Sequence, residues 1–154
     1  MKPRVAILGR HPDGTWRDAE RFKLTPAHPG LTILRFDGPL HFVNAATFED
    51  AVLAAWRDHP QMQALLLSSA GINDMDASGV DTLRRIHKQL AEAGHTLALC
   101  GLKKQVIDVL ERTGLWAELA PHAAYRSEDD ALRHLRPLLG GIDPAPEARR
   151  GFEW

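Results

Sequence analysis

The sequence is poor in residues that cross-link a chain or bind metals. Cys100 is the only cysteine among 154 residues, which excludes an internal disulfide framework and a cysteine-based zinc site. None of the eight histidines pairs with another at the spacing of metal ligands, so we expect no bound metal and no other cofactor. No apolar run approaches the ~18–20 residues that span a bilayer, and the N-terminus lacks a signal-peptide cleavage pattern. We therefore expect a soluble chain in a reducing cytoplasm.

An excess of charge of either sign is also missing. Nineteen Lys and Arg residues face 20 Asp and Glu residues, and the formal net charge is −1. This balance argues against a nucleic-acid partner, because nucleic-acid-binding domains are usually basic. The length and the 44% of hydrophobic residues are typical of one globular domain. We expect this domain to span residues 1–139 and a flexible tail, rich in Gly, Pro and Arg, to span residues 140–154.

Apolar runs and turn residues alternate along the chain in a regular order. Short apolar runs predict strands at residues 5–8, 31–36, 64–67 and 96–100. Amphipathic stripes predict helices that begin near residues 44, 78, 106 and 127, while residues 10–30 have the composition of a loop. Asn44 and Ser127 are the expected caps of the first and last helix. Strands that alternate with helices predict a small α/β fold with a mixed sheet, which is parallel at its centre and has its first strand antiparallel or at the edge.

Three apolar residues of the first expected helix share one face. Phe48, Val52 and Trp56 recur at helical spacing, so we expect them in the core and not in an interface. Cys100 ends a short buried strand, where a thiol most often serves as a small apolar core residue.

The loop between the third strand and the second helix is the most unusual segment. It contains Asp74 and Asp76, and Ser78 and Gly79 follow at the start of the helix. Ser78 and Asp81 match the S-x-x-D capping pattern, so Ser78 can cap the helix while Asp76 complements its dipole. Alternatively, a phosphate on Ser78 would meet free backbone amides and add negative charge beside these carboxylates. The residues alone leave both interpretations open.

Signals for catalysis are weak. The sequence contains no G-x-S-x-G elbow and no P-loop. His87 lies more than two helical turns from Ser78 and cannot act as its base. We therefore expect a protein that is not an enzyme.

Several segments together resemble one known family. Residues 76–83 read D-A-S-G-V-D-T-L and resemble the D-x-S-G-x-x-x-L signature of STAS domains. This family includes anti-sigma-factor antagonists and the cytoplasmic C-terminal tails of SulP-type sulfate permeases. Residues 3–10, 16–22, 34–45 and 108–115 are similar to segments of the permease tails, so the resemblance covers residues 3–138. Free-standing antagonists generally lack the opening segment, which favours a permease tail expressed without its membrane part.

The resemblance implies a STAS-like fold and a non-catalytic domain that regulates a SulP-family sulfate or anion transporter. It places the chain on the cytoplasmic face of the inner membrane, with the membrane domain of its own transporter as partner. Acyl carrier protein, a nucleotide and a second copy of the chain are further implied partners. Asp74, Asp76, Ser78 and Gly79 then form a regulatory, phosphorylated or anion-binding corner.

The alternative that the resemblance implies is a soluble anti-sigma-factor antagonist switched by phosphorylation of Ser78. Ala77 stands where antagonists usually have a second serine, and Trp16 stands where permease tails usually have tyrosine. The first departure removes one hydroxyl from the corner but leaves Ser78 in place.

Overall fold

The computed structural model describes residues 2–140 and contains one mixed five-stranded sheet, ordered β2-β1-β3-β4-β5. Strands β3, β4 and β5 are parallel, whereas β1 runs antiparallel to both β2 and β3. The predicted mixed sheet with a parallel centre is confirmed. The first strand is antiparallel as expected, but β2 occupies the edge. The strands are β1 (Arg4–Arg10), β2 (Trp16–Asp18), β3 (Leu31–Asp37), β4 (Ala64–Ser68) and β5 (Thr96–Cys100).

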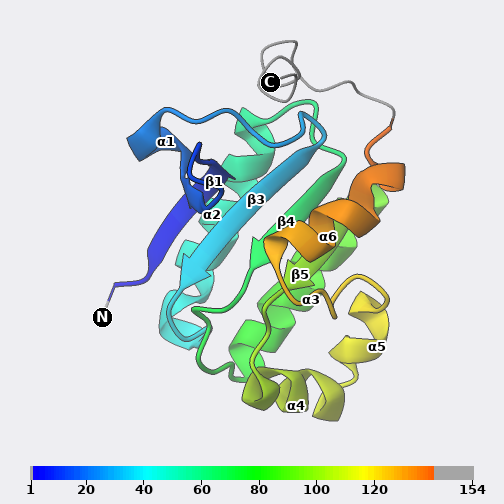
Figure 1. The fold of residues 1–154 in the computed structure, drawn as a ribbon. Coiled ribbons are helices and arrows are strands. Elements are labelled where there is room, and N and C mark those ends of the chain that lie inside the picture. Colours follow the sequence, from blue (N-terminus) through cyan, green and yellow to red (C-terminus); the bar gives the residue numbers. More distant parts are fainter. Residues whose placement is uncertain (1, 141–154) are drawn as a thin grey trace.

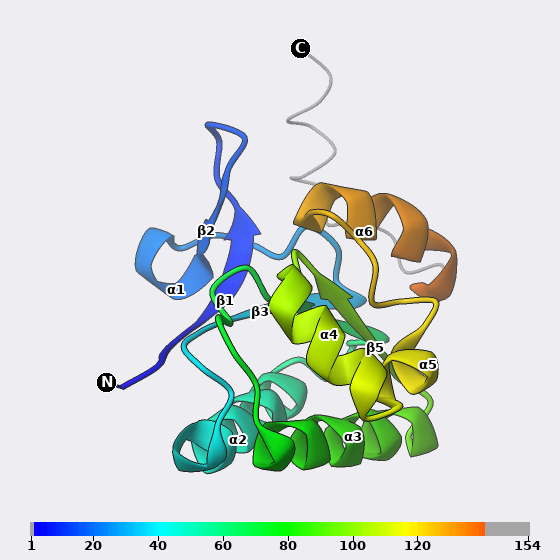
Figure 2. The same cartoon turned by 90° about the horizontal axis from the view of Figure 1, so that it is seen from below.

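Helices cover both faces of this sheet. Figure 2 shows α2 and α3 side by side on one face and α6 on the other. The order of elements along the chain can be followed in Figure 1. Within residues 2–140, no helix is both long and apolar enough to cross a membrane. The helices are α1 (Ala19–Phe22), α2 (Phe42–Asp58), α3 (Ala77–Glu92), α4 (Lys104–Arg112), α5 (Leu115–Leu119) and α6 (Glu128–Leu135), followed by the 3-10 helix η1 (Arg136–Leu138).

The central strand β4 has apolar residues on both of its faces. Leu65 and Leu67 belong to the core beneath α2 and α3, whereas Leu66 belongs to the core beneath α6. All three are fully buried, as a continuous apolar run in a covered parallel strand predicts. Phe48 is likewise fully buried in the core beneath α2 and α3. The half-buried Trp56 packs against the same core, so neither residue forms a free surface.

Several helix boundaries differ from the prediction. His41, not Asn44, is the N-cap of α2, and Asn44 instead donates from Nδ2 to the carbonyl of Pro39 at 2.8 Å. The predicted cap of α6 is confirmed, because Ser127 Oγ accepts from the amide of Asp130 at 3.1 Å. The short helix α5 was not expected, because its five residues are too few to show a period.

Residues 10–30 contain more structure than their turn-rich composition predicts. They include β2 and the single turn of α1, which Asp18 caps by accepting from the amides of Glu20 and Arg21 at 3.0 and 3.1 Å. Of the tail expected at residues 140–154, all but Gly140 lies outside the described residues, so that boundary stays a prediction.

Candidate functional site

The candidate corner is built from two segments that are distant in sequence. The loop from β4 to α3 runs beside residues 38–41, which connect β3 to α2, and the beginnings of α2 and α3 lie close together (Figure 2). Leu40 joins the segments through its backbone, because its amide donates to Asp74 O at 2.9 Å and its carbonyl accepts from Asp76 N at 3.2 Å. These are two of the segments that carry the family resemblance.

Asp76 connects the first turns of both helices. Its Oδ1 accepts from the amide of Gly79 at 2.9 Å, and its Oδ2 accepts from the amide of Phe42 at 2.9 Å. Asp76 is therefore the N-cap of α3, and the expectation that Ser78 caps this helix is wrong. The amide of Gly79 is also not free to meet a phosphate, because the Asp76 carboxylate already accepts from it.

Both carboxylates of the corner stay ionised near neutral pH. Burial acts to raise the pKa of Asp76, but hydrogen bonds from the amides of Gly79 and Phe42 outweigh it and hold that pKa below its ordinary value. The pKa of Asp74 is lowered by the backbone amide of Met75 and by His41, whose Nε2 lies 3.0 Å from Asp74 Oδ2. A third negative group placed here would meet the like charges of Asp74 and Asp76.

Gly79 is required by a close backbone approach. A Cβ atom at this position would lie 2.0 Å from the carbonyl oxygen of Leu40. The first turn of α3 therefore lies directly against the segment that precedes α2. The glycine of the D-x-S-G signature has a packing reason here that is independent of any ligand.

Ser78 is the second residue of α3 and is half-buried. Within residues 2–140, the structure gives its hydroxyl no hydrogen-bond partner. Asp81, three residues further on, lies 3.9 Å from Arg84 and does not complete a capping box. The Ser78 hydroxyl is thus partly open to solvent, beside Asp76 and one helical turn before Asp81.

An exposed apolar pair adjoins the corner. Phe42 and Val43, in the first turn of α2, are 76% and 79% exposed, although their neighbour Asn44 is buried. Sequence reasoning missed this pair because it began the helix at Asn44. The available signal was that two apolar residues lie off the buried stripe that continues through Phe48 and Val52.

The remaining candidates for chemistry lie elsewhere. Cys100 is buried, and burial raises the pKa of its thiol to about 12, so it is an unreactive core residue as expected. His87 lies further along α3 and is half-buried. Neither of the two surface hollows beside β1 includes Asp74, Asp76, Ser78 or Gly79.

The corner and the apolar pair next to it together have the features of a contact surface: two charges, a partly open hydroxyl and two exposed apolar side chains.

Comparison with known proteins gives one consistent result. The family model described as "STAS domain" matches residues 23–131. High affinity sulfate transporter 2 of Stylosanthes hamata is 27% identical over 128 residues, which cover 77% of this chain and 19% of the transporter. The chain spans only about a fifth of the length of the curated sulfate transporters that it matches.

Two solved structures share the fold. The murine Slc26a9 anion transporter in the inward-facing state has a TM-score of 0.77 at 19% identity, over 87% of this chain and 22% of that one. An anti-sigma factor antagonist from Mycobacterium paratuberculosis has a TM-score of 0.60 at 17% identity, over 86% of this chain and 95% of that one. These likenesses confirm the fold that the sequence resemblance implied.

Proposed function

The chain belongs to the STAS domain family, and from this we propose that it is the regulatory, protein-binding domain of a SulP-family sulfate or anion transporter. Its partner is the membrane domain of the same transporter, and its location is the cytoplasmic face of the membrane. The similarity to curated sulfate transporters along most of the chain carries this proposal. We propose no catalytic role.

The corner is the surface that we assign to this partner. The exposed apolar pair next to it, Phe42 and Val43, provides apolar surface that an interface would bury away from water. Asp74 and Asp76 lie beside the pair and supply charge that orients a partner. No residue here specifies acyl carrier protein or a nucleotide, so those partners and the homodimer stay predictions.

The test is sulfate uptake by the full-length protein in cells that lack their own sulfate transporter. We expect the double substitution Phe42→Glu and Val43→Glu to lower uptake by about tenfold at equal protein level, because it places two charges in the contact surface. Leu53→Glu is the matched control, since Leu53 is 41% exposed on the same helix but several turns away. Full uptake in the double variant would contradict the assigned surface. A full-length protein that transports no anion would contradict the function itself.

A second candidate function, the phosphorylation-switched antagonist, rests on Ser78. Its partly open hydroxyl has no hydrogen-bond partner within the described residues, and Asp76, two residues before it, binds the amide of the exposed Phe42. A phosphate there would be repelled by the ionised Asp74 and Asp76 and would change the charge of the contact surface. We expect Ser78→Asp to weaken binding to the cognate anti-sigma kinase by about tenfold, whereas Ser78→Ala retains it. Calorimetry measures both affinities, and equal affinities for the two variants would exclude the switch.

A further inference from the structure

A basic hollow lies beside the N-terminal strands, separate from the corner. It has a volume of about 520 Å³, which is within the range of small-molecule sites. Strands β1, β2 and β3 and helix α1 all contribute to it. Its lining includes four arginines and two aromatic residues: Arg4, Arg17, Arg21, Arg35, Trp16 and Phe22. Among residues 2–140, Asp18 is the one acidic residue in this lining.

The strand register brings two of these arginines to one face of the sheet. Arg4 pairs with Asp37 and Ala6 pairs with Arg35 across the antiparallel β1 and β3. Arg4 and Arg35 are therefore diagonal neighbours on the same face, at a separation that long side chains can bridge. Arg21 comes from α1, immediately after the edge strand ends.

Carboxylates neutralise only part of this charge. Arg17 pairs with Asp13, and Arg35 Nε lies 3.1 Å from Asp37 Oδ2. Asp18 Oδ1 already accepts from two amides of α1. Within residues 2–140, the structure pairs neither Arg4 nor Arg21 with a carboxylate. Among the described residues, two guanidinium groups of the hollow thus have no counter-charge.

Two buried donors in the lining also have no acceptor. The indole Nε1 of Trp16 and the Nε of Arg35 are both inaccessible to solvent and make no hydrogen bond in the described part of the chain. The ion pair of Arg35 with Asp37 is therefore a charge contact without hydrogen-bond geometry. Buried donors are normally satisfied, so two unsatisfied ones are unusual in one lining. Because neither atom is open to solvent, a ligand in the hollow would contact the exposed guanidinium groups and not these donors.

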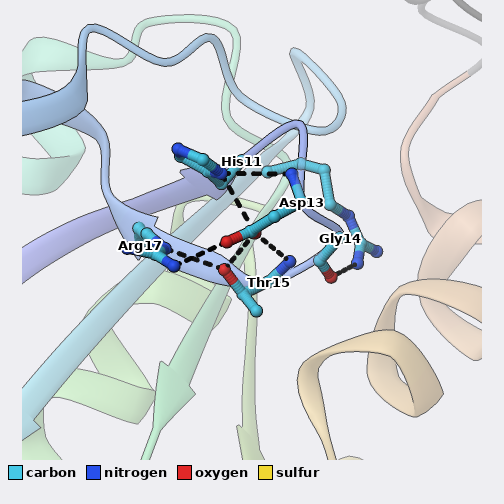
Figure 3. Close-up of polar contacts among 6 residues, drawn as sticks. His11, Asp13, Gly14, Thr15 and Arg17 are labelled. Atoms are coloured by element: carbon cyan, nitrogen blue, oxygen red, sulfur yellow. Dashed lines mark hydrogen bonds and ion pairs between the residues drawn. The ribbon is translucent and has the colours of Figure 1, made fainter.

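Polar contacts within the hairpin between β1 and β2 fix Arg17, which lines the hollow (Figure 3). Asp13 accepts from the amide of Thr15 at 2.9 Å and from Arg17 Nη2 at 2.5 Å. Hydrogen bonds from Thr15 and the nearby Arg17 guanidinium hold the pKa of Asp13 well below its usual range, so this pair stays charged. Arg17 is thereby held with its guanidinium carbon 5.4 Å from the ring centre of Phe22.

We propose that this hollow binds a phosphate group, with Arg4 and Arg21 as its counter-charges. Guanidinium groups match phosphate oxygens in pairs of parallel hydrogen bonds, and a phosphate has enough acceptor oxygens for several guanidinium groups. Val5 and Phe22, which also line the hollow and are 41% and 39% exposed, provide an apolar surface for the organic part of a phosphate ester. The phosphate belongs either to a small soluble ester or to a lipid headgroup. The proposal does not depend on the transporter assignment.

The first test is a nitrogen-15 NMR titration of the 154-residue chain with inorganic phosphate and, separately, with glycerol 3-phosphate. We expect saturable shifts at the amides of Val5 and Arg21 and at the indole N–H of Trp16. Sodium chloride at the same ionic strength should not reproduce them, because screening alone is not site-specific.

Charge-neutral variants separate this site from general surface charge. The double substitution Arg4→Gln and Arg21→Gln should weaken phosphate binding at least about tenfold, because it removes both unpaired guanidinium groups. Arg57→Gln with Arg112→Gln removes the same charge from the exposed surfaces of α2 and α4 and should change affinity by less than about twofold. Equal loss in both double variants would contradict a defined site.

A vesicle arm identifies the source of the phosphate. Sedimentation with phosphatidylcholine vesicles that do or do not contain phosphatidic acid measures binding of the headgroup form. Saturable binding of soluble phosphates supports a small-molecule site, whereas binding only to phosphatidic acid vesicles, lost in the Arg4 and Arg21 variant, supports a lipid site. Binding in neither arm would overturn the proposal.

Discussion

Replacing Gly79 by alanine should destabilise the domain by about 3 kcal/mol or more, although alanine normally strengthens a helix by about 1 kcal/mol relative to glycine. The new Cβ would lie 2.0 Å from the carbonyl oxygen of Leu40, and that atom belongs to the backbone and cannot rotate away. Either α3 must retreat or the segment before α2 must shift, and both movements disrupt the bonds of Asp76. Urea denaturation followed by circular dichroism measures the change.

Gly94→Ala is the matched control for that experiment. Gly94 has a φ of 82°, but a Cβ there would meet no atom within 4 Å. Its replacement should therefore cost only about 1 kcal/mol, the price of a left-handed backbone conformation. If Gly79→Ala is no more destabilising than this control, the close approach to Leu40 does not constrain the fold.

Phe48→Ala should remove about 3–5 kcal/mol of stability, because it empties a fully buried position between α2 and the sheet. The Phe48 ring meets the ring of Phe36 edge to face, with centroids 5.3 Å apart at 88°. This contact holds α2 on β3, so its loss also loosens the beginning of α2 at the corner. The free energy of unfolding is again measured by urea denaturation.

Phe42→Ala controls for the loss of an aromatic ring from the same helix. Phe42 is 76% exposed, so its truncation should change stability by no more than about 0.5 kcal/mol. A large loss for Phe42→Ala would mean that its ring packs within the domain and is not available to a partner.

Much of the fold could be predicted because the deciding signals are local. The apolar run of β4 needs only its own composition to indicate burial on both faces, and Leu65, Leu66 and Leu67 have that burial. Gly94 follows the last periodic residues of α3 and has the positive φ that ends a helix. Ser127 caps α6 through a bond that spans three residues.

The details of the corner depend on contacts that no local pattern contains. The S-x-x-D pattern favoured Ser78 as a cap, but Asp76 competes for the same position and gains a second bond from Phe42, which is 34 residues away. That additional bond favours Asp76 as the cap, because one half-buried carboxylate then satisfies the first turns of two helices. The start of α2 was missed for the same reason, since the group that satisfies its first turn lies in another loop.

The basic hollow could not be predicted from the sequence for a related reason. Arg4, Arg21 and Arg35 are spread along the chain and form no basic run. They share one hollow only because β1 and β3 pair in a particular register and α1 turns back beside β2. Net charge, which is −1 for the chain, gives no indication of such a local concentration.

The two hydrogen bonds that Asp76 accepts couple the first turns of α2 and α3 to each other. A group that draws this carboxylate away from α3 would also take the acceptor from the amide of Phe42, because the two bonds use the two oxygens of one side chain. A chemical change at Ser78 would thus be transmitted to the exposed apolar pair without any rearrangement of the sheet. If Ser78 is modified, Asp76 is the group that couples this hydroxyl to Phe42 and Val43.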